Sequence, residues 1–400
     1  MKLSMKDGFF SILDTLDIMD PALSVHHRQV GLLTLFLASE FKLEPQVRRD
    51  LLVAALLHDV GLLERDVKPM PNARYGHLHA KRGSGLVGLM PYFRRPADWI
   101  GLSHSADSVG EDNVPVHILQ ISEWIVEQMD DSIEILIQVP TLLQSVSDQK
   151  FGHGEEIVTC LRGNASLWFD LVSPLSGRIV RNACEDLIGD EEILLKDLCL
   201  FYVRLMDFSN SFTSIHSCGV AETAFEVSKL AGFDDESCHR IYMCGYLHDL
   251  GKVGISNEIL DKPGKLTEEE FNYIKQHPYF TYRILEPIAG MDILNTWAAY
   301  HHERLDGQGY PFGFGEADLS VGCQLMAVAD VLTALREDRT YRPGMSVEKT
   351  LGILNQMAGS ALSPTLVSLA IENFDQIDSA RKRRQDAEEE AAKLFRVEWS

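Results

Sequence analysis

The residues best suited to chemistry in this chain are histidines and aspartates that cluster in its second half. His248 directly precedes Asp249, and His301 directly precedes His302. Imidazoles and carboxylates are good ligands for divalent transition metals, and a pair of such ions can neutralise a phosphodiester during in-line attack. These residue types and spacings therefore predict a metal-dependent phosphohydrolase site.

The candidate metal ligands are five histidines and two aspartates, which suffice for two ions. They are His216, His248, Asp249, His277, His301, His302 and Asp330. Neighbouring side chains on a helix point about 100° apart, so His248 and Asp249 can reach different parts of one cluster. We expect Asp249 to bridge the two ions.

A lysine close to the His-Asp pair is the candidate for charge stabilisation. Lys252 follows Asp249 by three positions, on the same helical face or just beyond it. Its ammonium could stabilise charge on the phosphoryl oxygens or on the leaving group. The alternative is an exposed lysine whose charge complements a helix C-terminus. We favour the catalytic role because the metal-ligand cluster is adjacent.

The order of these motifs resembles that of the HD-GYP branch of the HD phosphohydrolase superfamily. The His248-Asp249 pair is followed by residues 301–311, which read HHERLDGQGYP. The resemblance covers residues 200–375, and the first 130 residues are more weakly similar to a bare HD domain. Members of this branch hydrolyse cyclic dinucleotides. The resemblance thus implies a cyclic dinucleotide phosphodiesterase that depends on metal ions.

The resemblance also implies residue roles. One ion would be held by His216, His248, Asp249 and Asp330, and the other by His277, His301 and His302, with Asp249 shared. Lys252 and Asp249 would lie at the catalytic centre. Tyr310 would shape the pocket, while Arg339 and Arg342 would contact substrate phosphates, for which guanidinium groups are suited. The alternatives are a role in turn geometry for Tyr310 and ordinary surface charge for the two arginines.

Three positions depart from the family pattern. Phe212 stands where the family often has a glutamate ligand for a third ion, Thr281 replaces a usual glycine, and Thr333 replaces a frequent aspartate. A phenyl ring cannot coordinate a cation, so we expect two ions, Fe or Mn, with Ni, Mg or Zn as alternatives. Without a third ion the linear dinucleotide is the expected main product.

The elements that must position these residues are predicted to be helices, and the fold class is all-α. Apolar residues recur at three- and four-residue intervals in several segments, including 30–41, 50–57, 241–247 and 325–335. Thr267 and Glu270 form a capping-box pattern at a helix start. Residues 381–390 are predicted to form a charged terminal helix whose charges face solvent.

An internal repeat organises the helices into two tandem HD-type domains. A register of 190 residues places His26 on His216 and the pair His58-Asp59 on His248-Asp249. A register of 198 residues places His79 on His277 and His104 on His302, and a third, of 207, places Glu123 on Asp330. We predict a degenerate HD-like domain at 1–145, a helical connector at 146–195 and an HD-GYP catalytic domain at 196–400.

The first copy lacks several of the implied catalytic residues. Leu62 stands at the position of Lys252, Ser103 stands at the position of His301, and no GYP sequence follows. Dinuclear catalysis is therefore not expected there. His26, His58, Asp59 and Glu123 would be enough for a single ion; the alternative is a structural or regulatory domain with leftover histidines.

Composition narrows the classes of partner. The net charge is −22, from 59 acidic and 37 basic side chains, which argues against binding to nucleic-acid polymers or anionic membranes. The 7 cysteines have no regular spacing and fit reduced thiols in the cytoplasm. No stretch approaches the length of a membrane span, and no secretory segment is evident at the start.

The expected function is hydrolysis of cyclic di-GMP or 3′,3′-cyclic GMP-AMP in bacterial second-messenger signalling. The alternatives are an HD-type phosphohydrolase acting on other nucleotides, which would need no GYP loop, and a non-catalytic sensor or interaction protein. Intact His301, His302 and Lys252 favour the enzyme. A homodimer or a signalling-protein partner is compatible with this sequence.

Overall fold

The structure is a computed structural model that describes residues 1–63, 78–104, 110, 112–149, 151–189, 191–209, 211–338 and 343–398. Of residues 209, 211–213 and 396–398 it describes the backbone alone. Helices make up most of the described chain, which confirms the all-α prediction. Two strands of 3 residues each, β1 (Lys2–Ser4) and β2 (Glu192–Leu194), pair in a two-stranded sheet.

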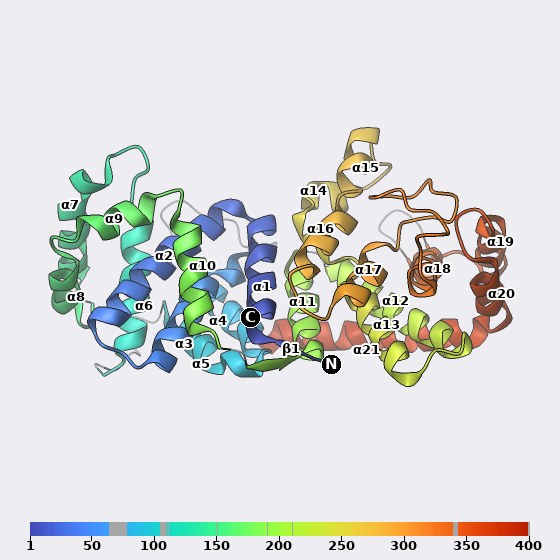
Figure 1. The fold of residues 1–400 in the computed structure, drawn as a ribbon, viewed down its shortest axis with the longest axis horizontal. Coiled ribbons are helices and arrows are strands. Elements are labelled where there is room, and N and C mark those ends of the chain that lie inside the picture. Colours follow the sequence, from blue (N-terminus) through green and yellow to red (C-terminus); the bar gives the residue numbers. More distant parts are fainter. Residues whose placement is uncertain are drawn as a thin grey trace. The chain divides into compact units, whose positions relative to one another are not determined.

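The described chain divides into two compact units (Figure 1). We call residues 4–193 the first unit, and residues 1–3 together with 194–398 the second unit. Most of the segment expected to connect the domains, 146–195, therefore belongs to the first unit. Within that unit, its helices pack against α2 (Pro21–Glu40), α3 (Pro45–Leu57), α6 (Val114–Glu127) and α7 (Ile135–Gln149).

The first unit consists of α-helices and two short 3-10 helices. They are α1 (Met5–Met19), α2 (Pro21–Glu40), α3 (Pro45–Leu57), η1 (Val60–Leu63), α4 (Leu78–Gly88), η2 (Pro91–Phe93), α5 (Arg94–Leu102), α6 (Val114–Glu127), α7 (Ile135–Gln149), α8 (Gly154–Leu161), α9 (Ala165–Val172) and α10 (Ser176–Leu187). Helix α2 begins after Asp20, whose carboxylate accepts the N–H groups of Ala22 and Leu23, both at 3.0 Å.

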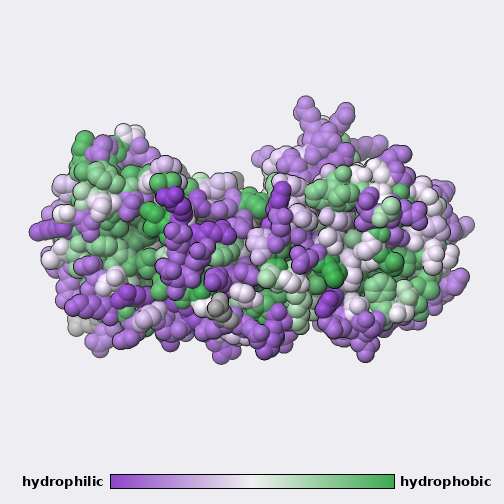
Figure 2. All heavy atoms as spheres, in the orientation of Figure 1, coloured by the Kyte–Doolittle hydropathy of each residue, from purple (hydrophilic) through white to green (hydrophobic). Residues whose placement is uncertain are grey.

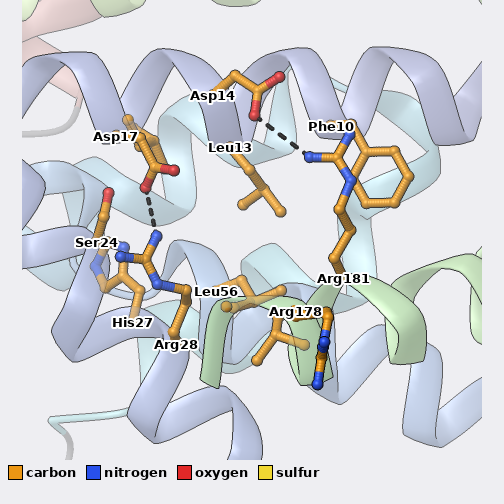
Figure 3. A pocket seen from close by; sticks show the side chains of 13 residues that line it. Phe10, Leu13, Asp14, Asp17, Ser24, His27, Arg28, Leu56, Arg178 and Arg181 are labelled. Carbon is orange, nitrogen blue, oxygen red and sulfur yellow. Dashed lines mark hydrogen bonds and ion pairs between the residues drawn. The ribbon is translucent and has the colours of Figure 1, made fainter. Parts of the chain in front are cut away.

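Helices α1, α2 and α10 supply most of the wall of a cavity of about 290 Å³ in the first unit (Figure 3). Two arginines on this wall are paired with carboxylates of α1. Arg28 donates to Asp17 at 2.6 Å, and Arg181 lies 3.7 Å from Asp14. His27 also lines the cavity, and in the described part of the chain neither of its ring nitrogens has a hydrogen-bond partner.

The second unit is likewise helical. Its elements are α11 (Leu195–Ser209), α12 (Ser211–Leu230), α13 (Asp235–Leu247), η3 (Leu250–Gly254), α14 (Asn257–Leu260), α15 (Glu268–Ile274), α16 (His277–Leu285), α17 (Asp292–Ala299), α18 (Val321–Arg336), α19 (Val347–Met357), α20 (Pro364–Glu372) and α21 (Phe374–Glu398). Helix α12 packs against α13, α18 and α21. The predicted capping box is confirmed at the start of α15, where Glu270 N–H donates to Thr267 Oγ1 at 3.2 Å and Thr267 N–H donates to Glu270 Oε2 at 2.7 Å.

The charged terminal helix is confirmed as α21, but the prediction that its charges face solvent is wrong for part of it. Arg381 and Glu388 are buried, 4% and 3% exposed. Glu388 accepts a hydrogen bond from buried Arg204 at 2.5 Å, and Arg381 donates to Asp378 at 2.6 Å. Because α21 packs against α12, one face of this charged helix is buried, and its charges find opposite partners there.

Polar side chains cover much of the visible surface, with apolar side chains in smaller patches (Figure 2). The large apolar side chains are mostly interior; Trp168 and Phe9 in the first unit and Tyr202 and Phe201 in the second are almost completely buried. Within the described ranges, no helix is both long enough and apolar enough to span a bilayer.

Candidate metal centre

The His-Asp pair of the second unit lies where one helix type changes into another. Helix α13 ends at Leu247, His248 caps it, and Asp249 precedes the 3-10 helix η3. Both residues are buried, with exposures of 0% and 1%. Gly251 lets η3 approach α16 closely, because a Cβ atom there would lie 2.0 Å from the backbone oxygen of His277.

Three of the candidate histidines are held by the same kind of backbone contact. The Nδ1 atoms of His248, His277 and His301 lie 2.8, 2.7 and 2.6 Å from the carbonyl oxygens of Gly245, Ile274 and Ala298, each three residues earlier. A carbonyl oxygen can only accept, so each Nδ1 carries the proton and each Nε2 keeps its lone pair. Metal-binding histidines are oriented in this way.

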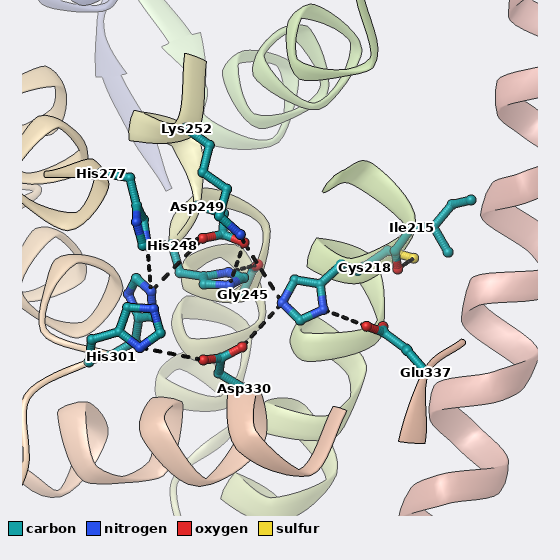
Figure 4. A network of polar contacts seen from close by, with 12 residues as sticks. Ile215, Cys218, Gly245, His248, Asp249, Lys252, His277, His301, Asp330 and Glu337 are labelled. Carbon is teal, nitrogen blue, oxygen red and sulfur yellow. Dashed lines mark hydrogen bonds and ion pairs between the residues drawn. The ribbon is translucent and has the colours of Figure 1, made fainter. Parts of the chain in front are cut away.

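The lone-pair atoms converge on the carboxylate of Asp249 (Figure 4). Its Oδ2 atom lies 3.2 Å from His248 Nε2 and 3.7 Å from His216 Nε2. Its Oδ1 atom lies 3.3 Å from His277 Nε2 and 4.0 Å from His301 Nε2. The two oxygens of Asp249 therefore face two different sets of histidines, the arrangement that a carboxylate between two ions requires.

Asp330 and His302 complete the cluster from α18 and from the segment after α17. Asp330 Oδ1 lies 3.1 Å from His216 Nε2, and its Oδ2 atom lies 3.8 Å from His302 Nδ1. Potential ligand atoms within 4.8 Å of one another form three overlapping groups: His216, His248 and Asp330; His248, Asp249 and His301; His277, His301 and His302. The structure thus brings together all seven residues predicted as ligands, and their donor atoms fit a transition metal.

Residues 183–366, which include all seven candidate ligands, match the family model described as HD domain. This part of the chain is an HD domain. The chain is 34% identical over 193 residues to a 3′3′-cGAMP-specific phosphodiesterase 1 of Vibrio cholerae, covering 48% of this chain and 44% of that protein. It is 31% identical over 183 residues to a cyclic di-GMP phosphodiesterase of Pseudomonas aeruginosa, covering 46% and 41%.

A solved structure shows the same fold as this chain, HD domain included. A cyclic GMP-AMP-specific phosphodiesterase of V. cholerae superposes with a TM-score of 0.60 at 18% identity, and the match covers 95% of this chain and 98% of that one. The chain spans less than half the length of the two curated relatives. The two-unit fold is therefore shared by structure, while the sequence similarity to those relatives is confined to part of the chain.

A buried glutamate that the sequence analysis missed orients one candidate ligand of the HD domain. His216 Nδ1 lies 2.7 Å from Glu337 Oε2, and Glu337 is 7% exposed. Gln385 of α21 donates to the other oxygen of this carboxylate. A carboxylate that accepts from the far side of a metal-binding imidazole fixes its orientation and raises its basicity. Glu337 follows Asp330 by seven positions, so a search along that helical face could have found it.

Electrostatics in the HD domain favour a bound cation. Burial would lower the pKa of His216, but Glu337 and Asp330 raise it to about 9. At pH 7 this ring therefore carries a positive charge next to two carboxylates, and a bound metal ion would take the place of its Nε2 proton. Burial lowers the pKa of His277 and, more strongly, that of His301, so both rings are neutral near pH 7. Burial would raise the pKa of Asp249, but His248 and Lys252 hold it well below its usual range. Neutral imidazoles and ionised carboxylates are the forms that bind metals.

A second missed residue, Glu303, organises the loop that carries Tyr310. Its buried carboxylate accepts the backbone N–H groups of Phe312, Gly313 and Phe314 at 2.7, 3.2 and 3.0 Å. The Tyr310 N–H donates to the carbonyl of His302 at 3.2 Å, and the two rings lie 4.8 Å apart between centroids. Tyr310 is thereby held beside a candidate ligand, with a cis peptide bond to Pro311.

Of the predicted residues that are not candidate metal ligands, Lys252 contacts the cluster, whereas the structure does not describe the two arginines. Lys252 Nζ donates to Asp249 Oδ2 at 2.6 Å, so the lysine reaches the cluster from η3. Arg339 and Arg342 lie outside the described residues, and so does the side chain of Phe212. Thr333 shares a hydrogen bond of 3.1 Å with Thr223 between α18 and α12.

Thr281 bridges the two segments that meet at the HD pair. Its Oγ1 atom accepts the Gly251 N–H at 2.9 Å and donates to the His248 carbonyl oxygen at 3.0 Å. The hydroxyl therefore connects α16 to the backbone on both sides of Asp249. Thr281, which the sequence analysis treated only as a departure from the family pattern, thus has a structural role.

Proposed function

We propose that the second unit is a metal-dependent phosphodiesterase that hydrolyses a cyclic dinucleotide, either cyclic di-GMP or 3′,3′-cyclic GMP-AMP. The observation that carries this proposal is the position of Asp249, whose two oxygens face His216 and His248 on one side and His277 and His301 on the other. Relatives named for both substrates support the choice of substrate class.

Two divalent transition-metal ions would be held by the seven ligands. His216, His248, Asp249 and Asp330 would bind one ion, and Asp249, His277, His301 and His302 would bind the other. The ions would neutralise the phosphodiester and lower the pKa of the attacking water. The mixed imidazole and carboxylate set suits Fe or Mn, and it also accommodates Ni or Zn; Mg prefers oxygen ligands.

Residues of this chain would supply the remaining functions. The Lys252 ammonium, 2.6 Å from Asp249, lies where it can stabilise negative charge on the phosphoryl group or the leaving oxygen. Tyr310, beside His302, would line the substrate pocket. Arg339 and Arg342 would bind the substrate phosphates. Glu337 would hold His216 in the ligating orientation.

The position of Phe212 supports two ions and a linear dinucleotide as the main product. Asp207 and Glu222 are the carboxylates near Phe212 in the sequence that would be candidates to replace the family's glutamate ligand. Asp207 instead accepts a hydrogen bond from Arg204 at 2.8 Å, and neither Asp207 nor Glu222 belongs to a ligand group among the described residues. Further cleavage of the linear product must then proceed without the charge of a third ion.

Two other functions are separable from this one by assay. An HD-type phosphohydrolase of other nucleotides would cleave mono- or triphosphates, and a cyclic-dinucleotide sensor or interaction protein would bind without cleaving. The enzyme is proposed to act in the cytoplasm on a small anionic substrate, alone, as a homodimer or with a signalling-protein partner.

The decisive experiment incubates the full chain with each candidate substrate after anaerobic loading with Mn or Fe(II). The panel contains cyclic di-GMP, 3′,3′-cyclic GMP-AMP, and common nucleoside mono- and triphosphates, with products separated by chromatography. We expect cleavage of at least one cyclic dinucleotide, and loss of that cleavage in His248→Ala. Cleavage confined to the ordinary nucleotides, or binding of cyclic dinucleotides without cleavage, would overturn the proposal.

A further inference from the structure

The first unit contains a second convergent set of metal-type side chains. Four histidines, one aspartate and one glutamate come together from α2, α4, α6 and the ends of α3 and α5: His26, His58, His79, His104, Asp59 and Glu123. His58, Asp59, His79 and Glu123 are buried, with exposures of 5% or less. Burying so many polar groups together is costly unless they are paired or bind an ion.

Distances within this set place Asp59 between two triads. Asp59 Oδ2 lies 3.3 Å from His58 Nε2 and 3.8 Å from His26 Nε2. Asp59 Oδ1 lies 3.3 Å from His79 Nε2, which is 2.8 Å from His104 Nε2. Within each triad the ligand atoms all lie within 4.8 Å of one another. Glu123 adds a carboxylate oxygen 3.1 Å from His104 Nε2.

The orientation of these groups repeats that of the second unit. His58 Nδ1 lies 2.9 Å from the carbonyl oxygen of Ala55, so its Nε2 atom keeps the lone pair and faces Asp59. A Cβ atom at Gly61 would lie 2.0 Å from the backbone oxygen of His79, so η1 approaches α4 as closely as η3 approaches α16. The first unit therefore shares with the second both the histidines and the backbone contacts that orient them.

From this geometry we propose that the first unit holds a divalent transition-metal centre of its own, built on Asp59 with His26 and His58 on one carboxylate oxygen and His79 and His104 on the other. Four imidazoles and two carboxylates suit Fe, Mn, Co, Ni or Zn. This centre is independent of the function proposed for the second unit. Its six residues exceed the four that the sequence suggested for a single ion.

The chemistry of this centre differs from that of the second unit. Leu62 stands where Lys252 stands, so no ammonium is supplied from η1, and Ser103 stands where His301 stands. Ser103 is buried and donates its hydroxyl hydrogen bond to the carbonyl of Ile100 at 2.8 Å, facing its own helix. The first unit thus keeps most of the candidate metal ligands, whereas η1 lacks the lysine that η3 carries in the second unit.

Metal analysis of the full chain tests this proposal without relying on activity. The variant His248→Ala/Asp249→Ala removes ligands from the second unit, and Asp59→Asn is then added to it. After anaerobic loading with Mn or Fe(II) and gel filtration, we expect stoichiometric metal in the double variant and its loss in the triple variant. Absence of metal from the double variant, or equal metal in both, would overturn the proposal.

Two milder variants guard against misfolding of the Asp59 variant. His26 and His104 belong to different triads, and their side chains are 21% and 20% exposed. We expect His26→Gln and His104→Gln, each in the double-variant background, to lower bound metal and to change the d–d absorption of the Co(II)-loaded protein. Unchanged metal content and unchanged spectra in both would contradict a centre at this place.

His27 offers a matched control on the same helix. It is adjacent to His26, but it lines the cavity bounded by α1, α2 and α10 and belongs to no ligand group in the described residues (Figure 3). His27→Gln should therefore retain the metal of the first unit, with helical content checked by circular dichroism. A loss of metal equal to that of His26→Gln would show that general destabilisation, and not ligand removal, explains the results.

Discussion

Lys252 Nζ lies 2.6 Å from Asp249 Oδ2. The lysine lies in the 3-10 helix η3, three residues after Asp249. One turn of that helix therefore places its ammonium next to the carboxylate at the centre of the candidate cluster. Its side chain remains 25% exposed, whereas that of Asp249 is 2% exposed. A cation at the edge of a buried ligand set can reach both the cluster and a substrate that arrives from solvent.

Removing this ammonium should impair turnover more than substrate affinity. If Lys252 acts mainly on charge that develops in the transition state, Lys252→Ala should lower kcat by about 10²- to 10³-fold with a smaller change in KM. Steady-state kinetics with the preferred cyclic dinucleotide measures both, and Lys252→Arg, which keeps the charge, serves as the control. An unchanged kcat in Lys252→Ala would assign the lysine to surface charge.

The two units should differ in their contribution to catalysis. We expect His248→Ala or Asp249→Ala to lower the bound metal and abolish phosphodiesterase activity, because each removes a ligand at the centre of the second unit. His58→Ala, the equivalent change in the first unit, should leave most of the activity intact. Elemental analysis and hydrolysis assays check both; equal losses of activity from the two units would contradict this division.

Glu337 should affect metal affinity without being a ligand. Glu337→Gln weakens the acceptor for His216 Nδ1–H, and loss of such a partner costs about 10- to 100-fold in metal affinity or activity. Competition with a chromophoric chelator measures the affinity. Glu348→Gln, on an exposed turn of α19, is the matched control and should have no effect. A similar affinity in both variants would rule out the orienting role.

Thr281 should stabilise the second unit through its two hydrogen bonds. Thr281→Val keeps the shape of the side chain but leaves the Gly251 N–H and the His248 carbonyl oxygen without this partner, which should cost about 1–3 kcal/mol in free energy of unfolding. Thr281→Ser retains the hydroxyl and should lose less. Denaturant unfolding of both variants, compared with the wild type, provides the measurement. Equal stability of the valine variant and the wild type would refute the bridge.

The product distribution should reflect two ions and not three. In a single turnover the linear dinucleotide should accumulate and mononucleotides should form slowly, because the linear product carries an additional terminal phosphate charge when it binds again. Chromatography of quenched samples, together with metal counting in the second unit, checks this. Prompt conversion to mononucleotides, or three ions in that unit, would contradict the inference from Phe212.

Much of the fold and of the site could be predicted from the sequence because the relevant signals are local. Helical periodicity indicated the all-α class, and the capping box at Thr267 and Glu270 marked a helix start that the structure confirms. The repeat at 190 residues related the pairs His58-Asp59 and His248-Asp249, which lie at equivalent helix ends. The seven candidate ligands were recognisable by residue type and order, and the structure gathers them in one cluster.

Other features were decided only by tertiary packing. The contact of His216 with Glu337 joins residues 121 positions apart, and the pairing of Arg204 with Glu388 joins residues 184 apart. No local pattern shows which of many charged side chains will be buried together, since that depends on which helix faces meet. Local sequence patterns were enough to predict the helices and the candidate ligand types on them. The packing of those helices decided which carboxylates orient the candidate ligands, and it turned the two oxygens of Asp249 and of Asp59 towards different sets of histidines.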